Sequence, residues 1–262
     1  ADGCTHAVVE VSGRMLARHA VGGGAAAIVA VPNIATAGTP RTSRALEERI
    51  LDALAPDGWL VTGTPSTPLA ALRRRTARHR GDARLLAAGL AAECDVSAVP
   101  LERGLFGQTF LLRAGGQSVP VAVDTPTAAF AADAVLAAAI GMRCGVSLEL
   151  AARGIEAAGA VSGRMERLDR GQDVPVFLDA PTSGHGLAAT LVGLRRLTRG
   201  RLAVIADDRW VQAVGTGVVR RRLTRWCDQS VVVPATMMAT DAADADIAAY
   251  ARIDRLMTRL GR

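Results

Sequence analysis

The sequence predicts an α/β protein made of two domains. Short apolar runs alternate with segments of helical periodicity, which is typical of parallel βαβ units. The alternation changes character after residue 95 and begins again near Val161, so two series are expected. We place the boundary at Gly159–Gly163, between domains 1–160 and 161–262. At 262 residues and half apolar, the chain can bury one large core or two modest ones.

The first series contains four apolar runs that read as buried strands, separated by helical patterns. The strands are expected at 6–11, 26–31, 58–62 and 83–88, and the helices at 41–54 and 67–78. Residues 95–123 carry short alternating runs around glycines, which indicate antiparallel hairpins. Ala-rich helices are expected at 126–141 and 147–158.

The second series repeats the strand and helix alternation, and we expect parallel βαβ units there too. Its strands are expected at 163–168, 174–179, 201–206 and 229–233, and its helices at 183–197, 210–225 and 241–260.

All 31 basic residues are arginine, and the net charge is +6. Two runs, 73–80 and 220–225, concentrate this charge. Nucleic-acid binders usually interleave such runs with stacking aromatics, and only Trp226 lies beside either run, which argues against nucleic acid as a partner. Solvated helix faces are the first interpretation, and a contact with an anion or a partner is the second.

The four cysteines, Cys4, Cys94, Cys144 and Cys227, are far apart and form no C-x-x-C pair, which argues against zinc and disulfides. No apolar run reaches the roughly 18 residues that a spanning helix needs, so no membrane contact is expected. The sequence begins without an initiator Met or a signal pattern. These features predict a cytoplasmic protein.

Several segments together resemble the Mur ligases, in particular the UDP-N-acetylmuramoyl-tripeptide synthetases. Residues 163–167 (GRMER), followed by a strand ending in Asp179, resemble the opening of the family's C-terminal domain. Residues 3–6 (GCTH) and 9–12 (VEVS) resemble a strand of its central domain, and residues 32–34 (PNI) stand where the family has T-N-L. The resemblance implies a P-loop-NTPase-like parallel sheet followed by a Rossmann-like C-terminal domain.

The family's activity, as the resemblance implies it, is ATP-dependent and needs Mg²⁺. A carboxylate attacks the γ-phosphate of ATP, and an amine then traps the acyl phosphate as an amide. A P-loop, G-x-x-x-x-G-K-[ST], cradles the phosphates in such enzymes. This sequence has no P-loop and no lysine, so the resemblance predicts a sheet that lacks its P-loop unit. The resemblance implies ATP and Mg²⁺, but we assign no cofactor to this chain.

Two carboxylates match the family's metal positions. Glu10 matches a metal carboxylate, a hard oxygen donor suited to Mg²⁺. Glu48 aligns with the family's carbamylated lysine and could preserve its negative charge. The alternative is that Glu48 belongs to an ordinary exposed helix face. The family's histidine after Glu10 is replaced by Arg14.

Other candidate site residues follow from the same resemblance. Ser12 and Asn33 match substrate-binding positions. The nucleotide or domain-junction candidates are Arg164, Asp179, Asp208 and Arg209. The alternative for the acids at strand ends is that they only cap loops at the carboxyl edge of a sheet, where open α/β sheets bind ligands.

Two hypotheses about function follow. In the first, the chain is a degenerate, catalytically impaired Mur-ligase-like protein that acts as a binding or scaffold protein, with a UDP-linked peptidoglycan precursor or a partner ligase as its partner. In the second, it is a fragment or subunit of an active ATP-dependent UDP-N-acetylmuramoyl-peptide–amino acid ligase. The altered positions favour the first hypothesis, because losing one preorganised donor typically costs about 10²–10³ in rate.

Overall fold

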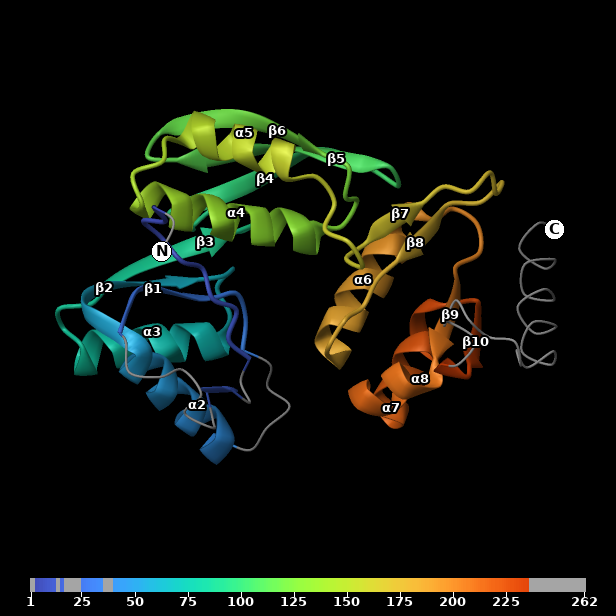
Figure 1. The fold of residues 1–262 in the computed structure, drawn as a ribbon, viewed down its shortest axis with the longest axis horizontal. Coiled ribbons are helices and arrows are strands. Elements are labelled where there is room, and N and C mark those ends of the chain that lie inside the picture. The colour runs from blue at the N-terminus through green and yellow to red at the C-terminus, as the bar shows by residue number, and fades with distance from the viewer. Residues whose placement is uncertain (1–2, 13–14, 17–24, 35–39, 236–262) are drawn as a thin grey trace. The chain divides into compact units, whose positions relative to one another are not determined.

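The computed structural model describes residues 3–12, 15–16, 25–34 and 40–235, and the α/β class is confirmed (Figure 1). The described chain forms two compact units, each described by itself below. The first unit comprises Ala1–Ala98, Leu112–Ser118 and Ala132–Ala151, and the second Val99–Leu111, Val119–Ala131 and Ala152–Arg262. The predicted boundary at 160/161 stays a prediction.

Three parallel strands begin the larger sheet, as predicted. β1 pairs with β2 and β2 with β3, both in parallel. The connecting helices begin and end within about two residues of their predicted bounds. The elements are β1 (Ala26–Val31), α2 (Pro40–Ala53), β2 (Leu54–Thr62), α3 (Thr67–His79) and β3 (Arg84–Gly89).

Helices α2 and α3 pack on β1 and β2 through one apolar cluster, and Figure 1 shows both helices beneath these strands. The cluster comprises Val31, Ile34, Ile50, Leu54, Leu60, Leu69 and Leu72. Pro68 near the start of α3 favours its first turn, where the missing N–H costs nothing. The carboxyl ends of the strands approach closely: a Cβ on Gly63 would lie 1.9 Å from the Pro32 carbonyl oxygen.

Strands β4 (Val96–Gly104), β5 (Gly107–Ala114) and β6 (Gln117–Val123) extend this sheet, in the order β1-β2-β3-β4-β5-β6. Two residues join β4 to β5 and β5 to β6, and so short a connection requires antiparallel neighbours. Gly115 and Gly116 both have positive φ, as a tight hairpin turn needs. The predicted hairpins are confirmed. Helices α4 (Ala128–Arg143) and α5 (Leu148–Ala158) follow, close to prediction.

The predicted strand at 6–11 is wrong. Residues 3–12 form no helix or strand. The side chains of Val8 and Val9 are 93% and 70% exposed, so this apolar run is not part of a core. A β-pattern becomes a strand only where a neighbouring strand completes its hydrogen bonds.

The second unit contains two small sheets. β7 (Glu166–Leu168) pairs antiparallel with β8 (Val176–Leu178), and β9 (Ala203–Asp207) pairs parallel with β10 (Gln229–Val233). All four strands were predicted, but the expectation that the first two belong to a parallel βαβ series is wrong. Only a short turn joins them, and parallel strands need a longer crossover connection, so the two strands must pair antiparallel.

Three helices accompany these strands: α6 (Gly184–Leu197), α7 (Asp208–Val214) and α8 (Thr216–Trp226). The single helix predicted at 210–225 is divided at Gly215, whose φ of +106° interrupts helical geometry. The predicted helix at 241–260 lies outside the described residues. No described helix has the length and apolar character to cross a membrane.

Candidate functional site

A tight turn opens the chain segment with the strongest family resemblance. The Glu166 Oε2 atom accepts hydrogen bonds from the Gly163 backbone N–H (2.8 Å) and the Ser162 hydroxyl (3.0 Å). These two bonds, the first above all, lower the pKa of Glu166. Gly163 and Met165 both have positive φ (68° and 50°), and only glycine adopts this conformation at no steric cost. Glu166 thus holds an unusual backbone conformation in place.

Asp179, at the end of β8, fastens this turn to α6. Its Oδ1 accepts the Met165 N–H at 3.2 Å, and its Oδ2 accepts the Thr190 hydroxyl at 2.5 Å. The Arg164 guanidinium donates to the Ala180 carbonyl oxygen. The structure therefore brings Arg164 and Asp179 together, and both act within the base of the β7–β8 hairpin.

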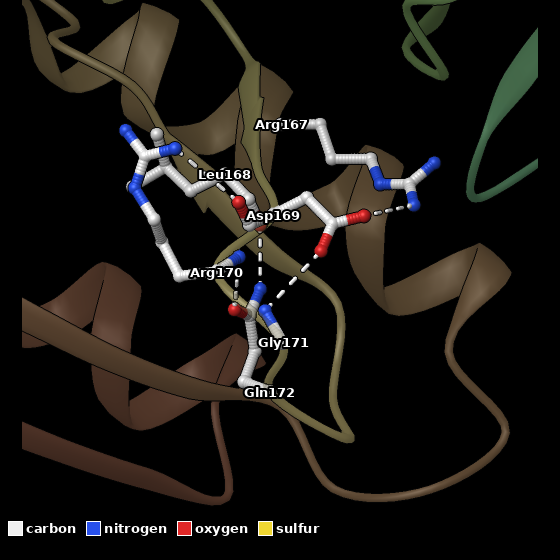
Figure 2. A network of polar contacts seen from close by, with 6 residues as sticks. All are labelled: Arg167, Leu168, Asp169, Arg170, Gly171 and Gln172. Atoms are coloured by element: carbon white, nitrogen blue, oxygen red, sulfur yellow. Dashed lines mark hydrogen bonds and ion pairs between the residues drawn. The ribbon is translucent and has the colours of Figure 1, made fainter.

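The turn of this hairpin is closed by its own side chains (Figure 2). The Gln172 side-chain amide donates to the Leu168 carbonyl at 2.5 Å, and its oxygen accepts the Arg170 N–H at 2.7 Å. Arg167 pairs with Asp169 at 3.2 Å. These contacts are local, and we assign the turn no ligand.

The carboxyl edge of the β9–β10 pair carries the other two second-unit candidates. The Asp208 Oδ1 accepts the Ala235 N–H at 2.9 Å, and Arg209 is exposed. Neighbouring Asp207 caps α7 by accepting the Trp210 N–H at 2.7 Å. The Trp210 indole N–H donates to the Pro181 carbonyl at 2.7 Å. This edge, where α/β sheets bind ligands, is thus tied together by internal bonds.

In the first unit, Glu48 contacts an arginine. The Arg75 guanidinium lies 3.2 Å from Glu48 Oε1 and 3.1 Å from Glu47 Oε2, so it bridges α2 and α3. Both carboxylates raise the pKa of Arg75, with the Glu48 hydrogen bond the largest cause. Glu47 is buried and Glu48 exposed.

These contacts do not fit a protein-held Mg²⁺ at Glu48. A guanidinium at hydrogen-bond distance repels a metal cation. Across the part of the chain that the structure describes, no three His, Cys, Asp or Glu residues gather in a group that could hold a metal. The contact favours the salt-bridged helix face, and the metal role of Glu48 stays a prediction.

The remaining first-unit candidates lie on the surface. Glu10 and Asn33 are exposed, and Glu10 does not end a strand as expected. The Ser12 hydroxyl oxygen accepts the Met15 N–H at 3.3 Å, a contact typical of a helix N-cap. Their proposed roles in metal and substrate binding stay predictions.

One buried polar residue escaped the sequence analysis. Gln108 is 5% exposed, and its side-chain amide donates to the carbonyls of Thr125 and Thr127, both at 2.7 Å. The Arg103 Nε donates to its oxygen at 3.2 Å. The signal was present, because Gln108 occupies an inward position of β5 shared with the buried Phe110. It holds the segment between β6 and α4 beside an open hollow of about 620 Å³.

Comparisons of sequence find three ligases. The chain is 40% identical over 118 residues to UDP-N-acetylmuramoyl-L-alanyl-D-glutamate–2,6-diaminopimelate ligase of Corynebacterium glutamicum, covering 44% of this chain and 23% of that protein. It is 29% identical over 147 residues to the protein of the same name from Bacillus licheniformis, covering 56% and 29%. The chain thus spans about a quarter of these relatives. No protein-family model matches.

Comparisons of structure agree on the fold. MurF from Acinetobacter baumannii gives a TM-score of 0.63 at 19% identity, over 79% of this chain and 46% of that chain. Folylpolyglutamate synthase from Mycobacterium tuberculosis, solved with ADP, gives 0.62 at 19% identity, over 80% and 47%.

Proposed function

Because this chain is similar in sequence to Mur ligases and shares their fold, we propose that it is a degenerate member of that family that no longer ligates. In this proposal it binds a UDP-linked peptidoglycan precursor or a partner ligase, as a binding or scaffold protein. The relatives are named as ligases of such precursors, which supports this class of ligand.

The observation that carries the proposal is that the acidic candidate residues form hydrogen bonds and ion pairs within the protein itself. Asp179 spends both carboxylate oxygens on the fold, on the Met165 N–H and the Thr190 hydroxyl. Asp208 accepts the Ala235 N–H, and Glu48 pairs with Arg75. Groups with protein partners at hydrogen-bond distance are typical of structural positions. Because these carboxylates bind groups of the protein itself, they support the proposal that the chain retains the family's fold without its catalytic activity.

The absence of lysine supports the same conclusion. Phosphoryl transfer needs cations positioned around the transferring group, and a lysine carbamate cannot form in a chain that has no lysine. Arginine presents a planar fork in place of a point charge, so it does not reproduce lysine geometry. The residues present therefore do not fit the family's implied ATP and Mg²⁺ chemistry.

Phosphate release tests the loss of catalysis. The chain is mixed with Mg-ATP, UDP-N-acetylmuramoyl-L-alanyl-D-glutamate and 2,6-diaminopimelate, and inorganic phosphate is followed over hours. The proposal expects the same rate with and without the chain. Phosphate release that requires both the precursor and the amine would overturn it.

The second candidate is a fragment or subunit of an active ligase. It is favoured by the similarity to full ligases that the chain covers only in part. This candidate predicts that a second polypeptide carrying a P-loop restores phosphate release when mixed with the chain. The degenerate-member proposal predicts no such restoration.

A further inference from the structure

The two arginine runs of the sequence differ in the structure. The first run, on and just after α3, is largely consumed by the fold of its own unit. Three of its arginines bind internal partners: Arg73 donates to Thr62, Arg75 pairs with Glu47 and Glu48, and Arg80 donates to the carbonyls of Leu51 and Leu54. Only Arg74 and Arg78 of this run stay exposed without a described partner.

The second run, on α8, has no such partners among the residues that the structure describes. Arg220, Arg221 and Arg225 are exposed, and Arg222 is half-buried. Within the described residues, none of these four has a carboxylate within 4.0 Å. The Arg225 guanidinium lies 5.2 Å from the ring centre of Trp226, on its own helix. Four cations thus occupy six residues of one helix, and no carboxylate of the described residues pairs with them.

The nearby acids are already used. Asp207 caps α7, Asp208 accepts the Ala235 N–H, and Asp228 binds both Arg195 and the Leu202 N–H at 2.7 Å. These are the three acids between residues 180 and 235. The positive charge of α8 is therefore not balanced within this part of the unit.

A second helix end adds to the same surface. Arg195, near the end of α6, pairs with Asp228, just after the end of α8, so the two helix ends lie together. Arg196 and Arg199 follow at the end of α6, and both are exposed. A cation in the last turn of a helix stabilises the helix modestly. This effect does not explain why α8 carries four arginines.

We propose that the exposed face of α8, with Arg220, Arg221 and Arg225, docks a protein partner through an acidic surface. The α8 arginines Arg221 and Arg225 lie one helical turn apart, so they match carboxylates spaced likewise on a partner helix. The proposal rests on the scaffold role proposed above and identifies the chemistry of the partner.

Two observations favour a protein over a nucleic acid. The α8 run has only Trp226 beside it, and this indole packs against the cluster of Leu187, Leu191 and Val219 with its N–H buried. Trp210 packs against the same cluster. No exposed aromatic ring is thus available among the described residues of this helical layer for stacking on bases, which single-strand binders need.

The test uses the full chain and fluorescent poly-L-glutamate of about 20 residues, with binding followed by anisotropy at about 50 mM salt. Arg221→Gln/Arg225→Gln is expected to weaken binding about tenfold. The matched control is Arg74→Gln/Arg78→Gln, which removes two exposed arginines at the same helical spacing from α3. Its affinity is expected to stay within about twofold of the original chain.

Three results would overturn the proposal: equal weakening by both variants, no binding of poly-L-glutamate, or binding of a DNA duplex of equal charge more than about tenfold tighter. Thermal unfolding checks the fold of each variant. If Arg221→Gln/Arg225→Gln is unstable, Arg220→Gln/Arg221→Gln replaces it, because that variant keeps the Arg225 contact with Trp226. Binding of the UDP-linked precursor is measured in parallel, so a failed scaffold surface is distinguished from a failed ligand site.

Discussion

The Thr190 hydroxyl donates a hydrogen bond of 2.5 Å to the Asp179 carboxylate, and this contact joins α6 to the base of the β7–β8 hairpin. The other oxygen of Asp179 holds the Met165 N–H. A residue that the family resemblance marks for a nucleotide or a domain junction therefore organises a strained turn in this chain. Substitutions at Asp179 and Thr190 test whether that role is structural.

Replacing Asp179 with Asn should lower the free energy of unfolding by about 1–3 kcal/mol, because the amide cannot satisfy both donors as the carboxylate does. Thr190→Val should cost about 1 kcal/mol. Urea unfolding measures both. Thr182→Val is the control, because Thr182 is exposed and its change should stay within about 0.5 kcal/mol. An Asp179→Asn variant as stable as the original would refute the structural role.

Because Arg75 bridges α2 and α3, its substitution should cost more folding stability than substitution of the neighbouring Arg74. Arg75→Gln should destabilise the chain by about 1–3 kcal/mol, because buried Glu47 loses its counter-charge. Arg74→Gln, at an exposed position of the same helix, should change stability by less than about 0.5 kcal/mol. A double-mutant cycle with Glu47→Gln measures the coupling. Zero coupling would contradict the bridge.

The Asp228 carboxylate is expected to contribute to folding stability at neutral pH but not in acid. The Leu202 N–H, and then Arg195, lower the pKa of Asp228. A lowered pKa means that the stabilisation is complete above the unfolded pKa of about 3.9 and is lost as pH falls through the folded value. Asp228→Asn should therefore lower the urea midpoint at pH 7, and the difference should shrink below about pH 4.

Asp173→Asn, at an exposed position, serves as the control for this pH series. Its urea midpoint should follow that of the original chain at every pH. A difference between Asp228→Asn and the original chain that stays constant from neutral to acid pH would show that charge on Asp228 contributes nothing.

Substitution by alanine should have opposite effects on folding stability at two glycines. Gly63→Ala should destabilise by about 3 kcal/mol or prevent folding, because the added Cβ would meet the Pro32 carbonyl oxygen. Gly154→Ala, in α5 with open space around it, should stabilise by about 0.5–1 kcal/mol. Thermal unfolding distinguishes them, and a well-tolerated Gly63→Ala would contradict the close approach of these two loops.

Local patterns predicted most of the secondary structure. β1, β3 and β10 were placed within one residue, because compact apolar runs between turn residues have few alternative interpretations. Two of the errors, at residues 6–11 and at β7–β8, have one common cause, the absence of pairing information in local sequence. Residues 6–11 read as a strand but pair with no strand among the described residues, and β7 and β8 pair antiparallel. The third, the division of the helix predicted at 210–225, comes from the positive φ of Gly215.

The candidate site was less accessible to sequence reasoning. A resemblance aligns Glu48 and Asp208 with family positions, but their partners, Arg75 and the Ala235 N–H, are 27 residues away along the chain in both cases. Such contacts depend on the packing of whole elements. The same limit explains why the two arginine runs looked equivalent in sequence and differ in the fold.

Calorimetry with Mg-ATP and with UDP-N-acetylmuramoyl peptide measures whether the chain binds either ligand. A ligand at about 100 times its Kd stabilises a fold by about 2.7 kcal/mol, so a matching thermal shift cross-checks each titration. For a degenerate member that retains the precursor as its ligand, we expect no heat and no shift with Mg-ATP, and a response to the nucleotide-sugar peptide. Saturable, magnesium-dependent binding of ATP would contradict the proposal.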